Sequence, residues 1–184
     1  MDLYLAEKSL NAMIKTRLMM LSSILIMHIP FVGLFVAPIF LVFWGIKFYI
    51  ALYKLGRAIS WCDVAFIIYL FSEVISIFQV DFVKMFYVGL QLLAISIIVI
   101  AINGVIKKST YVSVMYFGYV LILLKAVVAG INLYTMITGT TIYALSVTLL
   151  IISLVSFVWE VAYYKMAIFT FDSPYLYNND TYYY

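Results

Sequence analysis

The sequence predicts an all-α integral membrane protein, a single domain formed by a bundle of six transmembrane helices. Three observations support this fold class. Apolar residues make up 67% of the 184 residues and charged residues only 10%. Apolar runs of about twenty residues, enough to cross a hydrocarbon core about 30 Å thick, follow one another along most of the chain. These runs show no two-residue alternation, so helices rather than barrel strands must satisfy the backbone hydrogen bonds in lipid.

The long uncharged stretch 18–46 is predicted to form parts of two helices. It is longer than one untilted crossing requires, and Pro30 and Gly33 interrupt it. Proline lacks an amide donor and glycine permits turn dihedral angles, so residues 29–33 are expected to form a tight turn. We therefore expect the first span at about 11–29 and the second at about 34–53. The alternative is an N-terminal re-entrant hairpin, with four full crossings in the rest of the chain.

The remaining apolar runs predict four further spans, at about 61–79, 85–106, 111–137 and 142–166. Short polar breaks separate them, at 80–81, 107–110 and 138–140. Loops of this length join antiparallel neighbours. The membrane domain is therefore expected to cover residues 1–171. Pro174 ends any helix in the short, polar, tyrosine-rich tail at 172–184.

The positions of lysine and arginine favour six crossings. With six spans, only Lys84 falls on one side, Lys125 lies within a span, and the other nine fall on the opposite side: Lys8, Lys15, Arg17, Lys47, Lys54, Arg57, Lys107, Lys108 and Lys165. If 18–46 were one crossing, the same residues would divide four against six. Cytoplasmic loops carry the excess of positive charge, so we expect a multi-pass protein of the cell membrane with both termini in the cytoplasm.

Several functional classes are disfavoured by composition. The formal net charge is +3, without the dense basic stripe of a nucleic-acid-binding protein. Cys62 is the sole cysteine and His28 the sole histidine, so an internal disulfide, a Cys-pair metal site and a bis-histidine haem site are excluded within one chain. No catalytic or cofactor motif is present. The sequence therefore predicts a protein that is not an enzyme and has no cofactor.

Glu73 and Lys125 are the most informative polar residues. A charge near the bilayer centre costs roughly 2.5–3.5 kcal/mol on insertion scales, so each should face the bundle and find a partner. Glu73 lies about 18 Å along its predicted helix and Lys125 about 21 Å along its own, both measured from the cytoplasmic side. We expect them to form an intramembrane charged pair, which is either structural or the centre of an ion or solute path. A third possibility is that Glu73 bonds a partner subunit.

Other polar residues within the predicted spans are expected to have more ordinary roles. Ser72 and Ser76 flank Glu73 at helical spacing and indicate a polar, packed face. Asn103 and Asn132 are expected to hydrogen-bond between helices. Glu160 is expected to be an interfacial carboxylate near the cytoplasmic end of the last span.

Two pairs of small residues are spaced four apart, Gly33 with Ala37 and Ala126 with Gly130. Such pairs allow helices to approach closely, so these positions are expected at helix contacts.

Met20, Met27 and His28 are weak candidates for binding a soft metal ion, because thioether sulfur suits Cu(I). The alternative is that the methionines pack within the bundle and His28 lies at the membrane interface.

Three functions remain open at this point. The first is a non-enzymatic accessory or structural subunit, in contact with the lipid bilayer and with other membrane subunits or further copies of itself. It is favoured by the small size and minimal loops. The second is a small solute or ion transporter or channel centred on Glu73 and Lys125. The third is an intramembrane enzyme acting on lipid or quinone, with Glu160 or Glu73 as the base.

Overall fold

A computed structural model describes residues 1–27, 29, 32–78, 81–107, 111–139 and 143–171. Within these residues the chain forms six α-helices, which confirms the all-α class and the six-helix bundle. They are α1 (Leu3–Ile26), α2 (Val32–Ala58), α3 (Cys62–Ser76), α4 (Asp81–Ile106), α5 (Ser113–Thr138) and α6 (Tyr143–Phe171).

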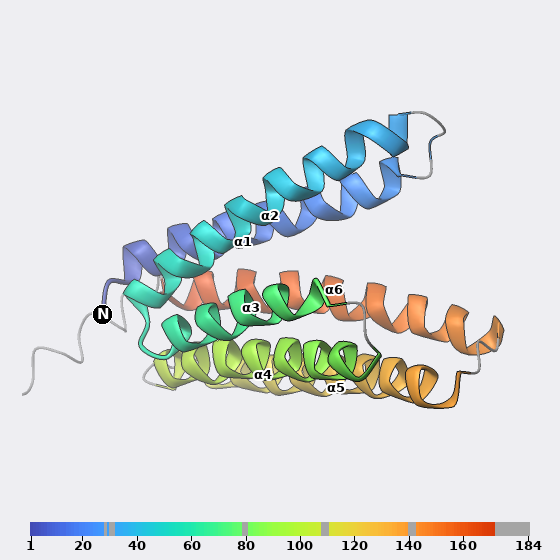
Figure 1. The fold of residues 1–184 in the computed structure, drawn as a ribbon. Coiled ribbons are helices and arrows are strands. Elements are labelled where there is room, and N and C mark those ends of the chain that lie inside the picture. Colours follow the sequence, from blue (N-terminus) through green and yellow to red (C-terminus); the bar gives the residue numbers. More distant parts are fainter. Residues whose placement is uncertain (28, 30–31, 79–80, 108–110, 140–142, 172–184) are drawn as a thin grey trace, which may run out of the picture.

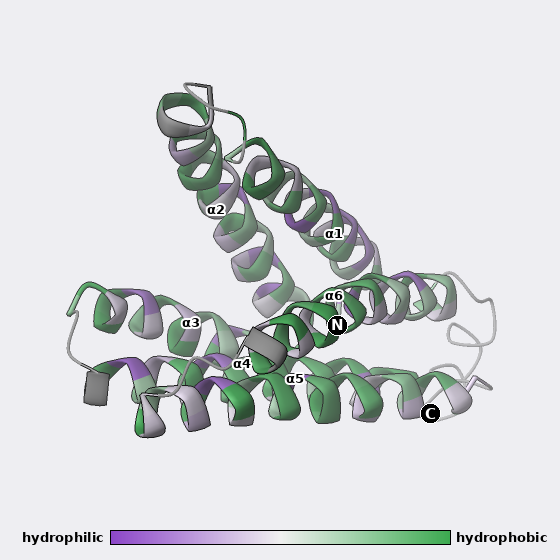
Figure 2. Ribbon diagram, turned by 90° about the vertical axis from the view of Figure 1, so that its right-hand side faces the viewer, coloured by the Kyte–Doolittle hydropathy of each residue, from purple (hydrophilic) through white to green (hydrophobic). Residues whose placement is uncertain are grey.

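The helices form two groups that meet at one end. Helices α1 and α2 form an antiparallel hairpin, and α3 to α6 lie side by side as a second group (Figure 1). The hairpin contacts this group through α1 on α6 and α2 on α3. It meets the group at the end that carries the N-terminus and leans away from it towards the α1–α2 turn, as the second view also shows (Figure 2). The helices alternate in direction, so Leu3, Ala58 and Phe171 lie at the same end.

Among the residues that the structure describes, four helices are long and apolar enough to cross a membrane. These segments are Phe35–Ala58, Val83–Ile106, Ser113–Thr138 and Leu145–Phe171, in α2, α4, α5 and α6. Helix α3 has 15 residues, a length of about 22 Å that is shorter than the hydrocarbon core. Helix α1 is long enough, but Lys15 and Arg17 interrupt its apolar sequence. Full crossing by α1 and α3, and hence the six-span topology, remains a prediction.

The first helix begins eight residues earlier than the span predicted at 11–29. Asp2 caps it, because its carboxylate accepts a hydrogen bond of 2.9 Å from the backbone N–H of Leu5. Aspartate is a favoured residue at this position, since it satisfies an amide that lacks a partner within the helix. The added turns also bury Ala6 and Leu10. This early start places Arg17 deep in the helix rather than near its end.

Two glycines permit the tight turns at either end of α2. At Gly33, an added Cβ would lie 2.8 Å from the carbonyl oxygen of Ile26, so only glycine fits the turn from α1. At Gly56, it would lie 2.7 Å from the backbone nitrogen of Asp63, where α3 begins. Trp61 closes this second turn with φ of 75°, an unusual angle for a residue other than glycine.

The core lies where the hairpin meets the other helices. Its largest fully buried apolar side chains come from α1, α2, α4, α5 and α6: Leu10, Met13, Leu52, Leu55, Ile98, Ile102, Ile106, Leu121, Tyr163, Tyr164 and Phe171. Polar bonds fix the α4–α5–α6 contact. The hydroxyl of Tyr163 donates to Asn103 Oδ1 at 2.9 Å, and Trp159 Nε1 donates to the Phe117 carbonyl at 2.9 Å while its ring stacks on that of Phe117.

Candidate functional site

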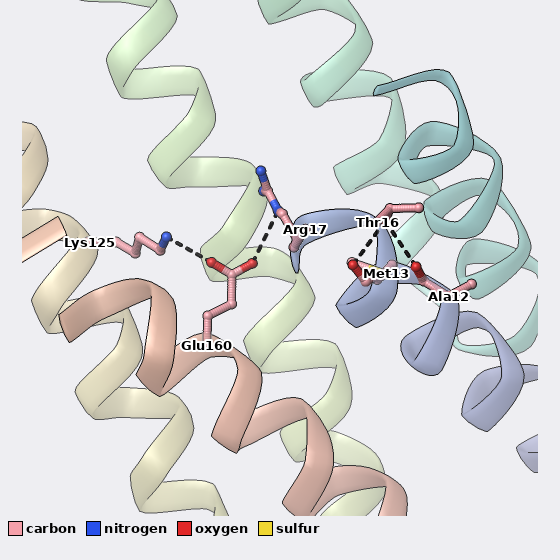
Figure 3. Close-up of polar contacts among 6 residues, drawn as sticks. All are labelled: Ala12, Met13, Thr16, Arg17, Lys125 and Glu160. Atoms are coloured by element: carbon pink, nitrogen blue, oxygen red, sulfur yellow. Dashed lines mark hydrogen bonds and ion pairs between the residues drawn. The ribbon is translucent and has the colours of Figure 1, made fainter. Parts of the chain in front are cut away.

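Glu160 is the centre of a charged cluster formed by three helices. The residue is 2% exposed. Lys125 Nζ of α5 lies 2.8 Å from its Oε2, and Arg17 Nε of α1 lies 3.5 Å from its Oε1 (Figure 3). A buried carboxylate requires such compensation, because an unpaired charge is strongly disfavoured away from water. The cluster therefore ties the hairpin to α5 and α6. We call Arg17, Lys125 and Glu160 the charged cluster.

The charged cluster lies far from the helix ends. At 1.5 Å per residue, Arg17 is about 21 Å from the start of α1, Lys125 about 18 Å from the start of α5, and Glu160 about 16 Å from the end of α6. These three helix ends are at the same end of the molecule (Figure 1). Half the thickness of a hydrocarbon core is about 15 Å, so a membrane aligned with the helices would place the cluster near its middle.

Arg17 is only loosely engaged by Glu160. Among the described residues its Nε has no hydrogen-bond partner, although it lies within ion-pair distance of the carboxylate. The guanidinium carbon lies 4.2 Å from the centre of the Phe48 ring, a cation–π contact. The far end of the guanidinium points away from Glu160 (Figure 3). Two cations thus share one carboxylate, and Arg17 also lines the space between the hairpin and α3–α4.

Glu73 faces the same space from α3, but its hydrogen-bond partners are neutral. The hydroxyl of Tyr49 donates to Glu73 Oε1 at 2.9 Å, and Gln91 Nε2 approaches the same oxygen at 3.4 Å. Gln91 Nε2 also donates to Ser72 Oγ at 2.7 Å. The carboxylate of Glu73 is therefore held by groups from α2 and α4 that do not neutralise it.

The structure gives Lys125 a different partner from the predicted one. Its ammonium bonds Glu160, whereas the hydrogen bonds of Glu73 come from Tyr49 and Gln91. Glu160 is likewise not the interfacial carboxylate that we expected, because it is buried among α1, α5 and α6. The expected pairing was wrong because Glu73 and Glu160 lie at similar depths, about 16 Å from the same end of the bundle. Depth alone could not choose between them.

Two neighbouring cavities adjoin the charged residues. The larger has a volume of about 510 Å³ and lies between the hairpin and α3–α4, lined by Arg17, Met20, Leu41, Val42, Gly45, Ile46, Phe48, Tyr49, Tyr69, Glu73, Tyr87 and Gln91. The smaller has a volume of about 260 Å³ and is lined by Arg17, Tyr69, Tyr87, Val88, Gln91, Leu92, Ile95, Lys125, Val128, Ala129 and Asn132. Four of these residues are common to both, so the cavities adjoin at Arg17, Tyr69, Tyr87 and Gln91. Together they offer cationic, anionic, amide and phenol groups to one small molecule.

The other predicted polar residues divide between the cavities and the helix contacts. Asn132 lines the smaller cavity. Asn103 instead joins helices, because its Nδ2 donates to the Met115 carbonyl at 3.2 Å and its Oδ1 accepts from the Tyr163 hydroxyl. Ser72 and Ser76 donate to carbonyls of their own helix, and Ser76 is exposed.

The small residues predicted at helix contacts lie in different surroundings. Ala37 is buried and Gly33 lies at the α1–α2 turn. Ala126 is half-buried, but a Cβ added at Gly130 would meet nothing within 4 Å. Gly130 is therefore exposed on α5 rather than at a close helix contact within this chain.

The methionine and histidine candidates are not brought together as a recognisable metal centre. Met20 lines the larger cavity, Met27 is exposed at the end of α1, and His28 lies outside the described residues. In the part of the chain that the structure describes, no group of three or more His, Cys, Asp or Glu side chains is placed to hold a metal ion.

Sequence reasoning missed Arg17 and the tyrosines of the cavities. The charge pattern predicts Arg17 on the cytoplasmic side. The sequence signal that places it deeper in the helix is the cap at Asp2, which starts α1 earlier. Tyr49, Tyr69 and Tyr87 line the cavities. They belong to a chain with 17 tyrosines, so no pattern set them apart from tyrosines at the membrane interface.

No family model, curated protein or solved structure matches this chain.

Proposed function

We propose that this protein is a small membrane transport protein that binds a polar solute in the two cavities beside the charged cluster. One observation carries the proposal: Arg17, Glu73 and Lys125, three charged residues deep in the bundle, all line these cavities. Ionisable residues within membrane segments are rare, and they mark ion and substrate pathways. The volume of about 510 Å³ is within the range of small-molecule sites.

The position of the larger cavity supports a transport role. Its lining comes from α1 and α2 on one side and from α3 and α4 on the other. A solute held there would contact both helix groups, so its binding would depend on the angle between the hairpin and the remaining helices. Domain closure around a ligand is a common way to couple binding to movement.

A second candidate function is an accessory subunit of a larger membrane assembly. The direct bond between Lys125 and Glu160 favours it, because a buried pair of this kind fixes which helices meet. The two functions differ in what they require of the cavities. Transport requires that water and solute reach them, whereas an architectural pair requires no access.

Cysteine accessibility tests the proposal with a matched pair of variants on α5. Val128 lines the smaller cavity, and Val127, one residue away at the same depth, is 42% exposed on the outer surface of the bundle. We would introduce Val128→Cys and Val127→Cys separately in a Cys62→Ala background and treat membranes with a charged, water-soluble thiosulfonate reagent. Such reagents modify thiolates in water far faster than thiols in lipid.

We expect the reagent to modify the cysteine of Val128→Cys and to leave that of Val127→Cys unmodified. If neither cysteine is modified and the thermal unfolding profile shows that both variants are folded, the result would contradict a transport cavity and favour the accessory subunit. Rapid modification of both would place α5 in water and contradict the membrane arrangement itself.

A further inference from the structure

We propose that the ligand of these cavities is a small zwitterion, with its anionic group between Arg17 and Lys125 and its ammonium group at Glu73. This inference rests on the proposed function and adds the chemical class of the solute. It follows from the arrangement of charge along the two cavities.

The smaller cavity offers an anion site. Arg17 and Lys125 are both on its wall, and none of the described residues that line it is acidic. Glu160 is not among these lining residues, and its single charge neutralises only one of the two cations. The far end of the Arg17 guanidinium points away from Glu160 (Figure 3). The amides of Gln91 and Asn132 complete the wall. A planar guanidinium fits a carboxylate or phosphate in a bidentate manner.

The larger cavity offers a cation site. Glu73 is an acidic residue on its wall, held by Tyr49 and Gln91. Two carboxylate oxygens provide about four acceptor positions, so capacity remains for the donors of an ammonium group. The rings of Phe48, Tyr49, Tyr69 and Tyr87 also line this cavity. Aromatic rings attract cations through their faces.

Overall charge also favours a zwitterion. Arg17 and Lys125 balance Glu73 and Glu160, so the four side chains sum to zero before a ligand binds. A zwitterion preserves this balance, whereas a lone anion or cation would add a net charge deep in the bundle, where charge is costly. The apolar residues Met20, Val42 and Ile46 on the wall of the larger cavity suit an apolar substituent. Either a free amino acid or the headgroup of a zwitterionic lipid supplies this chemistry.

Thermal unfolding of the purified full chain in detergent tests the inference with matched probes. Leucine carries both charges, leucinamide only the positive charge, and 4-methylpentanoate only the negative charge. In a second series, phosphatidylethanolamine and phosphatidylglycerol in mixed micelles compare a zwitterionic with an anionic lipid. A ligand that binds only the folded state raises the unfolding temperature as its concentration rises.

We expect the unfolding temperature to rise with leucine but not with either single-charge analogue, or to rise with phosphatidylethanolamine but not with phosphatidylglycerol. The first outcome identifies a free solute and the second a lipid headgroup. Failure of both zwitterions, or an equal response to leucinamide, 4-methylpentanoate or phosphatidylglycerol, would overturn it.

Glu73→Gln provides the decisive variant, because it keeps the shape of the side chain and removes only its charge. We expect it to weaken the response to the zwitterion by at least about tenfold in half-saturating concentration. Glu7→Gln, on α1 and outside both cavities, is the matched control and should keep the wild-type response. An unchanged response in Glu73→Gln would contradict the assigned orientation. If Val128→Cys is accessible but no zwitterion binds, the ligand class is wrong while the transport cavity stands.

Discussion

The ammonium of Lys125 lies 2.8 Å from the carboxylate of Glu160 and joins α5 to α6 deep within the bundle. Glu160 also attracts Arg17 at 3.5 Å, so one buried carboxylate links three helices. Removing one member of a buried ion pair leaves an uncompensated charge, whereas replacing both can be nearly neutral. The stability of the fold should therefore depend more on Glu160 than on either cation alone.

Glu160→Gln should lower the free energy of unfolding by about 3 kcal/mol, because it leaves Lys125 and Arg17 without their common anion. Unfolding by a denaturing detergent, followed by circular dichroism, measures this change. The double variant Lys125→Met, Glu160→Gln should recover part of the loss. Equal stability of the wild type and Glu160→Gln would show that the charged cluster does not hold these helices together.

Gly118 and Gly130 on α5 should respond in opposite directions to the same substitution. A Cβ at Gly118 would lie 2.7 Å from Val99 Cγ1 and 2.9 Å from Tyr163 Cε2, so Gly118→Ala should cost about 1–3 kcal/mol through overpacking. A Cβ at Gly130 would meet nothing, so Gly130→Ala should gain about 0.5–1 kcal/mol through lower backbone entropy in the unfolded chain. The same unfolding measurement compares them. A stabilised Gly118→Ala variant would contradict the close α4–α5–α6 contact.

Tyr163→Phe should destabilise the protein by about 1–3 kcal/mol, since it removes the hydroxyl that donates a hydrogen bond to the buried Oδ1 of Asn103. Tyr116 is 68% exposed and provides the control. Thermal unfolding of Tyr163→Phe and Tyr116→Phe should differ clearly. A Tyr163→Phe variant with wild-type stability would indicate that the Tyr163–Asn103 bond is absent in the membrane.

Cys62 should be inert to thiol reagents until the protein unfolds, because its side chain is fully buried. Labelling of the wild type with a maleimide during a denaturant titration should follow the loss of helical signal. Rapid labelling of the native protein would show that α3 does not pack against its neighbours as described.

The sequence was sufficient to predict where the helices lie along the chain, but not which face of each helix is buried. Apolar runs and their polar breaks located six helices. Pro30 and Gly33 predicted a break between the first two, and α1 does end at Ile26 and α2 begin at Val32, although residues 30–31 of the predicted turn lie outside the described part of the chain. The helices are apolar nearly all round, so periodicity gives little indication of which side is buried. Arg17 and Glu160 therefore could not be placed facing one another. Their meeting depends on the crossing of the hairpin over α6, which is a tertiary feature.

We propose that α1 crosses the membrane and carries Arg17 to the depth of Lys125 and Glu160. Single cysteines at Tyr4 and Met27, both exposed and at opposite ends of α1, test it directly in a Cys62→Ala background. An impermeant thiol reagent applied to sealed, oriented vesicles should label Tyr4→Cys and Met27→Cys from opposite sides. Labelling of both from the same side would show that α1 does not span the bilayer and would contradict the charged cluster as a mid-membrane site.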